Sequence, residues 1–184
     1  MKQYLVERGK NEGVDSFLHR LYNDLGYTDL CVSYNYHNHG TMMFSKWIPY
    51  TKIMHMEREN KLLLLNKMTH RSILDIEIMF DIDEPIPYKS IVQKAAHIYH
   101  GLKDEGYEPV TYFTGSKSYH ISIIDLNLRK MSSYLRSTLK RKKIALYGCD
   151  LMKSASRCMI AMEGAKHYKS GELNRRIHWI WKGL

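Results

Sequence analysis

The chain has 184 residues, 44% of them hydrophobic, so it is long enough to bury the core of a single domain spanning residues 1–184. Its net charge of +9 favours an anionic partner, above all nucleic acid. No apolar stretch approaches the length of a membrane-spanning helix, and the N-terminus lacks the apolar segment of a signal peptide. These features predict a cytoplasmic protein. They leave open whether it comes from a mobile element, such as a virus or plasmid, or acts within a larger complex.

The chain has three cysteines at irregular spacings: Cys31, Cys149 and Cys158. So few unpatterned cysteines indicate reduced thiols rather than a disulfide framework. With histidines such as His37 or His167 they do not form the C-x-x-C spacing of an ordinary zinc site. We therefore predict neither disulfides nor zinc.

The N-terminal part of the chain predicts one helix followed by short strands. Apolar residues at helical spacing predict the helix over residues 14–25. Residues 30–36 are typical of a strand, and residues 37–40 of a turn. We expect two further short strands within residues 44–65.

Residues 74–83 alternate between an apolar face and a face with four acidic side chains. A strand places alternate side chains on opposite faces, so Asp81 and Asp83 point the same way at its end. Two such carboxylates lie roughly 7 Å apart and can converge on divalent cations. A half-buried strand with a solvated acidic face is the simpler alternative. Glu77 lies roughly 13 Å from Asp81, too far for one metal cluster, so we expect a salt-bridged or solvated role for it and for Asp75.

Beyond this strand the pattern predicts two helices, over residues 87–106 and 128–143. Pro87 suits the first turn of the first helix, and Gly106 can end it. Four strands are expected in the same part of the chain: 109–114, 119–124, 156–162 and 176–181. Because helices and strands are mixed without strict alternation, we expect an α+β fold with a mixed, largely antiparallel sheet flanked by helices.

Residues 115–118 form a turn of small residues that lets backbone N–H groups approach a phosphate. Lys117 adds a cation to this turn. His120 starts the next strand on the side opposite its apolar residues, where its imidazole can reach the same ligand. An ordinary hairpin with a surface histidine is the alternative.

Positive charge is concentrated after this hairpin. One short stretch contains seven basic residues: Arg129, Lys130, Arg136, Lys140, Arg141, Lys142 and Lys143. Such a stretch suits a nucleic-acid backbone, although a solvated helix face would have the same composition.

Three pieces of the sequence, taken in order, resemble the archaeo-eukaryotic primase superfamily. Its members have a D-x-D motif after an apolar strand, then a small-residue turn ending in histidine, then a further aspartate. Here these look like Phe80 to Asp83, Gly115 to His120, and Asp150. The segment from Arg157 to Gly171 also resembles the family's run of arginine, histidine, lysine and glycine. The chain departs from the pattern at Ser118, where many members have glycine, and it shows no zinc module or helicase domain.

The resemblance implies a primase-polymerase (RRM-like) catalytic core that transfers nucleotides from (d)NTPs along a single-stranded DNA template, aided by helicase or other replication subunits. It implies that Asp81, Asp83 and Asp150 hold two divalent ions, Mg²⁺ or Mn²⁺, whose hard character suits carboxylates. It also implies a set of residues that bind the nucleotide: Ser116, Lys117, His120, Arg157, His167 and Lys169.

Two other functions stay open from sequence. One is a non-catalytic nucleic-acid-binding protein that retains the primase fold. The other is a metal-dependent nuclease, which also uses clustered carboxylates and a histidine; the His37-Asn38-His39 run invites that comparison but lacks the metal-finger context. Ribonucleotide or deoxyribonucleotide preference, de novo priming or extension, template preference and oligomeric state are not determined by the sequence.

Overall fold

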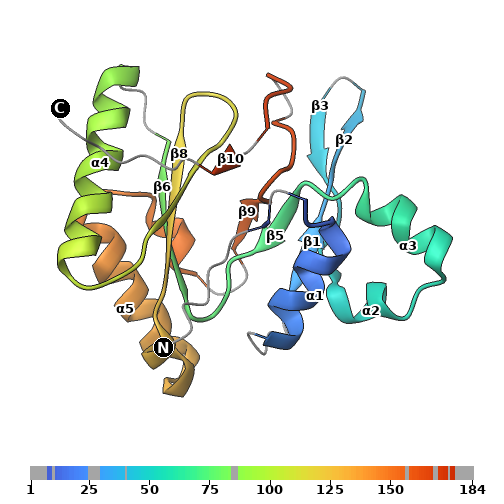
Figure 1. Cartoon of the computed structure of the whole chain (residues 1–184), viewed down its shortest axis with the longest axis horizontal. Coiled ribbons are helices and arrows are strands. Elements are labelled where there is room, and N and C mark those ends of the chain that lie inside the picture. The colour runs from blue at the N-terminus through green and yellow to red at the C-terminus, as the bar shows by residue number, and fades with distance from the viewer. Residues whose placement is uncertain are drawn as a thin grey trace.

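The computed structural model describes residues 8–9, 11–24, 30–39, 41–83, 87–155, 158–167, 170–173 and 175–176. In this part of the chain the strands form two four-stranded sheets and a separate two-stranded hairpin, with every pairing antiparallel. Helices pack on these sheets (Figure 1). The α+β fold with antiparallel sheets flanked by helices is thus confirmed, although the strands divide between two sheets.

The first sheet has the order β4-β1-β5-β9, and the second has the order β10-β7-β8-β6. The first sheet consists of β4 (Ile48–Pro49), β1 (Cys31–Ser33), β5 (His70–Ser72) and β9 (Met159–Ala161). The second consists of β10 (Arg175–Arg176), β7 (Val110–Phe113), β8 (Tyr119–Ile124) and β6 (Glu77–Ile82). The hairpin consists of β2 (Asn35–Asn38) and β3 (Thr41–Phe44), and it projects at one edge of the molecule (Figure 1).

Five α-helices and two 3₁₀ helices surround the sheets in the described part of the chain. They are α1 (Val14–Asp24), α2 (Tyr50–Met54), α3 (Arg58–Leu65), α4 (Tyr88–Asp104), η1 (Leu126–Lys130), α5 (Ser133–Leu146) and η2 (Leu151–Ser154). Figure 1 shows α4 and α5 beside the second sheet, whereas α1, α2 and α3 lie at the other end, near β1. None of the described helices is long and apolar enough to cross a membrane.

Helix α4 follows the sequence pattern closely. Its N-cap is Pro87, whose fixed φ suits a helix start, and it ends just before Gly106, which has a φ of +86°. Ile91, Ala95 and Ile98 are each at most 1% exposed, because this stripe packs into the apolar core. That core also includes residues of α1, α5 and both four-stranded sheets, so α4 anchors β6 and β8 to the rest of the molecule.

Several predicted boundaries were wrong. Apart from Phe44, the last residue of β3, the strand residues within 44–65 are the two of β4, and α2 and α3 follow. The apolar run at the end of α3 consists of good helix formers, and Leu62 and Leu63 are 48% and 63% exposed, so this run does not form a buried strand. The strand expected at residues 30–36 is split into β1 and β2, and the helix expected at 128–143 begins only at Ser133, after Ser132 caps it. Of the strand expected at 156–162, residues 158–162 are described and contain β9, and of the strand expected at 176–181 only residue 176 is described, in β10.

Strand β6 is buried on both faces, which corrects the expectation of a solvated acidic face. Ile78 and Phe80 join the main core as predicted, but Met79 on the opposite face is only 1% exposed and packs against Ile73 and Ile160. Glu77 is also fully buried. The residues around β5 and β9 cover this second face of β6, and the sequence of β6 alone contains no signal for that.

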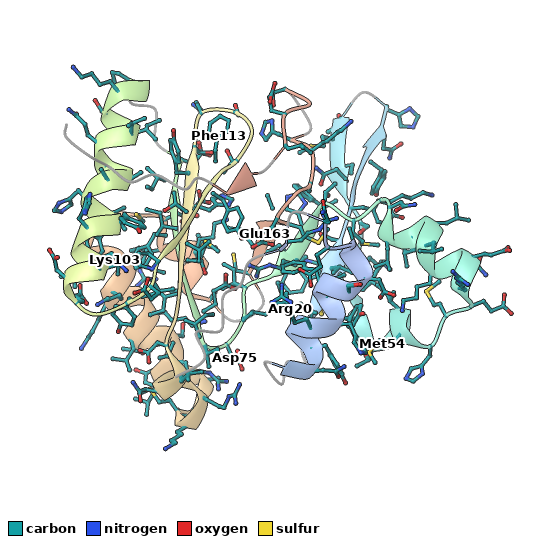
Figure 2. All side chains as sticks on the ribbon, viewed as in Figure 1. Arg20, Met54, Asp75, Lys103, Phe113 and Glu163 are labelled. Atoms are coloured by element: carbon teal, nitrogen blue, oxygen red, sulfur yellow. The ribbon has the colours of Figure 1, made fainter. Side chains whose placement is uncertain are left out.

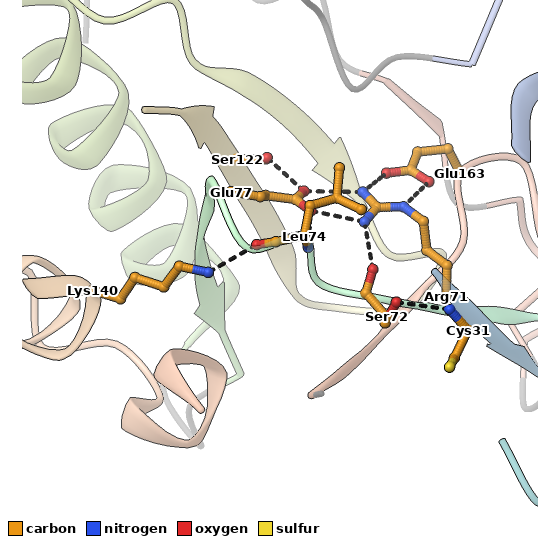
Figure 3. A network of polar contacts seen from close by, with 8 residues as sticks. All are labelled: Cys31, Arg71, Ser72, Leu74, Glu77, Ser122, Lys140 and Glu163. Atoms are coloured by element: carbon orange, nitrogen blue, oxygen red, sulfur yellow. Dashed lines mark hydrogen bonds and ion pairs between the residues drawn. The ribbon is translucent and has the colours of Figure 1, made fainter. Parts of the chain in front are cut away.

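Glu77 belongs to a charged network that joins the two sheets (Figure 3). Arg71 on β5 donates to Glu77 on β6 at 2.8 and 3.0 Å, and to Glu163 at 2.6 and 3.0 Å. Ser122 and the Leu74 backbone N–H also donate to Glu77, at 2.7 and 3.0 Å. Figure 2 shows Glu163 near the middle of the molecule. The salt-bridged role expected for Glu77 is confirmed, and Asp75 likewise pairs with Arg136 at 2.9 Å.

Candidate active site

A cavity of about 640 Å³ lies where β6 and β8 approach β5 and β9. Its lining includes ionisable side chains from β6, the residue after it, β8 and η2: Asp81, Asp83, His120 and Lys153. It also includes rings from β3, the segment before β4, and β5: Phe44, Trp47 and His70. The cavity therefore combines charged groups with aromatic surface, and its volume is within the range that binds small molecules.

Strand pairing places Asp81 and His120 together. The antiparallel register of β6 and β8 sets them directly opposite each other, and their side chains share one face. His120 Nε2 lies 3.3 Å from Asp81 Oδ1, and Lys153 Nζ lies 3.1 Å from Asp81 Oδ2. A carboxylate thus lies between an imidazole and an ammonium group at the cavity wall.

The charges of this group stabilise one another. Burial alone would raise the pKa of Asp81, but His120 and Lys153 outweigh burial and hold that pKa below its ordinary value. Burial would likewise lower the pKa of Lys153, yet the nearby carboxylates, Asp81 first among them, raise it. Asp81 and Lys153 are therefore both ionised at neutral pH. His70 across the cavity has its pKa lowered to about 4, first by burial and then by His120 and Lys153.

One oxygen of Asp81 lacks a hydrogen bond. Oδ1 is buried and has no hydrogen-bond partner among the described residues, although His120 Nε2 lies 3.3 Å away as an ion-pair partner. A buried acceptor of this kind is costly unless a ligand completes it. Asp83, two residues further along, is exposed and also lines the cavity. An orphaned carboxylate oxygen beside a second carboxylate fits Mg²⁺ or Mn²⁺, which prefer oxygen ligands.

Asp150 lies beside Asp81 through its backbone, but its side chain is engaged elsewhere. Its backbone N–H donates to the carbonyl of Asp81 at 3.4 Å. Its Oδ1 accepts from the backbone N–H of Met152 at 2.9 Å, which caps η2. Asp150 is exposed and does not line the cavity. Within the described ranges, no group of three or more histidine, cysteine, aspartate or glutamate side chains could hold a metal ion.

The turn between β7 and β8 lies at the cavity entrance. Thr114 and Ser118 line the cavity, whereas Ser116 and Lys117 are exposed at the tip of the turn, outside that lining. Gly115 has a φ of +89°, and a Cβ there would lie 2.7 Å from the carbonyl oxygen of Glu172. This position therefore requires glycine, because the backbone of residue 172 packs directly onto the turn.

His167 reaches the same turn from the C-terminal part of the chain. A Cβ on Gly115 would lie 2.9 Å from the Cβ of His167, and His167 also lines the cavity. The hydroxyl of Ser170 donates to the carbonyl of Gly115, which fastens this segment to the turn. The structure thus brings His167 to the cavity together with Asp81, Asp83 and His120. Arg157 and Lys169 lie outside the described residues.

Sequence reasoning missed two features of the site. Lys153 follows Asp150 by three residues, and nothing in that spacing alone indicates that its ammonium group pairs with Asp81. The cavity lining also includes the aromatic residues Phe44 and Trp47. They belong to residues 44–65, where two short strands were expected. A sequence signal did exist there, since the run Phe44-Ser45-Lys46-Trp47 places a cation between two aromatic residues.

No protein-family model matches the sequence, and no curated protein matches it. Solved structures do match. Primase RepB′ has a TM-score of 0.56 at 14% identity, over 89% of this chain and 56% of that one. The polymerase domain of Mycobacterium tuberculosis ligase D, solved in complex with DNA, has a TM-score of 0.51 at 10% identity, over 80% of this chain and 63% of that one. This chain has the fold of primase and polymerase domains. It spans less than two thirds of the length of either structure.

Proposed function

We propose that this chain is a template-directed nucleotidyltransferase of the archaeo-eukaryotic primase superfamily. In this role it is a primase or primase-polymerase that joins nucleoside triphosphates along single-stranded DNA during replication, with a helicase or other replication subunits as further partners. The observation that carries the proposal is the pairing of Asp81 with His120 across β6 and β8, at a cavity, on a fold that primase domains share. The order of the motifs in the sequence supports it independently.

Asp81 and Asp83 are the residues that would hold divalent ions, Mg²⁺ or Mn²⁺. When bound, such ions make the 3′-hydroxyl of the growing strand more acidic and neutralise charge on the triphosphate and the leaving pyrophosphate. Asp150 takes part once its carboxylate leaves the backbone N–H of Met152, and its backbone already contacts that of Asp81. Its contribution to the raised pKa of Lys153 supports its electrostatic proximity to this group.

The basic side chains around Asp81 bind the triphosphate in this proposal. His120 and Lys153 project from separate elements toward one carboxylate, so a phosphate beside that carboxylate meets both the imidazole and the ammonium group. His167 and Thr114 extend this lining. Ser116 and Lys117 reach the phosphates from the exposed turn. Arg157 and Lys169, which lie outside the described residues, are further phosphate contacts in this proposal because the sequence resemblance implies them. The β6–β8 pairing keeps Asp81 and His120 in register, which preorganises the site.

A non-catalytic nucleic-acid-binding protein is the second candidate. The observation that favours it is the engagement of Asp150 as the cap of η2, which leaves Asp81 and Asp83 as the only carboxylates among the described residues that line the cavity. Because catalysis by two metal ions needs several oxygen ligands, a chain whose Asp150 never leaves the cap would bind DNA without extending it.

One assay distinguishes these functions. The protein is incubated with a labelled primed template, an unprimed template, (d)NTPs, and Mg²⁺ or Mn²⁺. Longer products or new oligonucleotides support the proposal, a shortened template indicates a nuclease, and retardation on a gel without either indicates binding alone. Asp81→Ala should abolish product while template binding is retained. Undiminished synthesis by that variant would refute the site assignment.

A further inference from the structure

The β2–β3 hairpin and the segment that follows it place two exposed rings at the cavity. Phe44, the last residue of β3, is 53% exposed, and Trp47 is 42% exposed. We call these two side chains the aromatic rim. Both line the cavity, so they border it while their surfaces remain open to solvent. Large exposed aromatic side chains at a cavity mouth are typical of ligand contacts.

We infer that the aromatic rim binds an unpaired base of single-stranded nucleic acid as the strand enters the cavity. This inference rests on the proposed function and adds to it the surface that receives the template. Aromatic faces stack on bases of any identity, and each stacked base contributes substantially to single-strand binding.

The register of the hairpin separates its two faces. Asn35 lies directly opposite Phe44, so these side chains share one face, and both line the cavity. Tyr36 lies directly opposite Met43 on the other face, and each is 42% exposed. Exposed apolar side chains therefore lie on both faces of the hairpin, and Phe44 is on the face that borders the cavity.

Asn35 adds a polar group beside the rim. Its Oδ1 is buried and finds no hydrogen-bond partner in the part of the chain that the structure describes. A side-chain amide can pair with the donor and acceptor groups on the edge of a base. An unsatisfied amide oxygen next to an aromatic ring is therefore suited to a base that stacks on Phe44.

Two observations favour a strand over a free nucleotide as the ligand. Lys46, between Phe44 and Trp47 in sequence, is exposed, so a cation for a backbone phosphate accompanies the two rings. The net charge of +9 favours a polyanion as well.

The test is a binding measurement with a fluorescent oligothymidylate, followed by anisotropy at fixed salt. We expect Phe44→Ala and Trp47→Ala each to raise Kd about tenfold, which corresponds to about 1.4 kcal/mol per lost ring. Asn35→Ala should raise it roughly fivefold. The aromatic replacements Phe44→Tyr and Trp47→Phe should restore most of the affinity. Leu63→Ala, which removes a 63% exposed apolar side chain on α3, is the matched control and should leave Kd unchanged.

Each other outcome overturns the inference. If the alanine variants bind the oligonucleotide as tightly as the wild type, the rim is not its binding surface. If the alanine variants lose affinity for a labelled mononucleotide but not for the oligonucleotide, the ligand of the rim is the free nucleotide rather than a strand. If they change only the molecular mass measured by light scattering, the rim is an interface between copies of the chain. Nucleotide incorporation by the wild type is measured separately. If the wild type binds the oligonucleotide through the rim but makes no product, the proposed function is refuted and the inference about the rim is not.

Discussion

Strand β6 contains one acidic residue near each end, and the two have opposite environments. Glu77 is fully buried, and both of its oxygens accept hydrogen bonds from Arg71 and further donors. Asp81 lies at the cavity, where Lys153 binds one oxygen while the other has no hydrogen-bond partner among the described residues. In sequence the two carboxylates belong to one alternating pattern.

The difference between them separates a buried charge that stabilises the fold from a buried charge that is available to a ligand. A network whose donors and acceptors are all satisfied fixes a single arrangement, and here it joins the two sheets. A carboxylate that is held ionised but left incompletely bonded can bind a ligand without first breaking the fold. Variants at the two ends of β6 should therefore fail in different ways, and the following predictions proceed from the largest expected effect to the smallest.

Arg71→Met should cause the largest loss of stability. It leaves Glu77 and Glu163 buried without their cation, which costs about 3–5 kcal/mol in comparable buried pairs. We expect a correspondingly lower midpoint in urea denaturation followed by circular dichroism. The triple variant Arg71→Met, Glu77→Leu, Glu163→Leu removes all three charges and should regain most of the loss. An Arg71→Met protein as stable as the wild type would contradict the structural role of this network.

His70 should make the stability depend on pH. The pKa of His70 is about 4 in the folded protein and 6.5 when unperturbed, so the unfolded chain binds more protons between these values. Stability from this residue is complete above pH 6.5 and is lost as the pH falls toward 4, by up to about 3 kcal/mol. Urea denaturation across this range should show a steeper decline for the wild type than for His70→Gln. Parallel profiles for the two proteins would show that His70 titrates normally.

Lys153→Met should tighten the binding of Mn²⁺ by about tenfold, or about 1.4 kcal/mol, because the ammonium group no longer competes for Asp81. Calorimetric titration of Mn²⁺ measures this. Lys103→Met is the matched control, since Lys103 also pairs with a carboxylate, Glu108 at 2.6 Å, but at the far end of α4 (Figure 2). Weaker or unchanged Mn²⁺ binding by Lys153→Met would mean that Mn²⁺ and the Lys153 ammonium group do not compete for Asp81.

Asp75→Asn should have the smallest effect. Asp75 pairs with Arg136 at 2.9 Å, and its side chain is 43% exposed, so solvent screens the pair. We expect a loss of less than about 0.5 kcal/mol in urea denaturation. A loss of stability comparable to that of Arg71→Met would show that Asp75 is as important to the fold as Glu77.

Local sequence patterns predicted most of the helices and strands near the site. The apolar stripe of α4, the Pro87 start and the strands β7 and β8 follow from spacing and turn residues within the segment itself. The pairing of β6 with β8 then places Asp81 opposite His120. The helix and the individual strands were predictable because each depends on residues close in sequence, whereas the pairing of β6 with β8 joins distant residues and comes from the structure.

The remaining features depend on contacts between distant residues. The second face of β6 is buried because β5 and β9 cover it, and Arg71 and Glu163 are 92 residues apart in sequence. Lys153 reaches Asp81 only after η2 packs beside β6. The sequence contains no register for such contacts, so it did not identify Arg71 as the partner of Glu77 or Lys153 as the partner of Asp81, nor did it indicate that Asp150 caps η2.

Nucleotide incorporation by Asp81→Asn beside Asp75→Asn tests the central claim most directly. Both variants remove one charge from the same acidic series, but only Asp81 lines the cavity. With a primed single-stranded template, dNTPs and Mn²⁺, we predict that Asp75→Asn extends the primer at the wild-type rate while Asp81→Asn loses at least about a thousandfold in rate. Equal extension by the two variants would contradict the assignment of Asp81 to the active site.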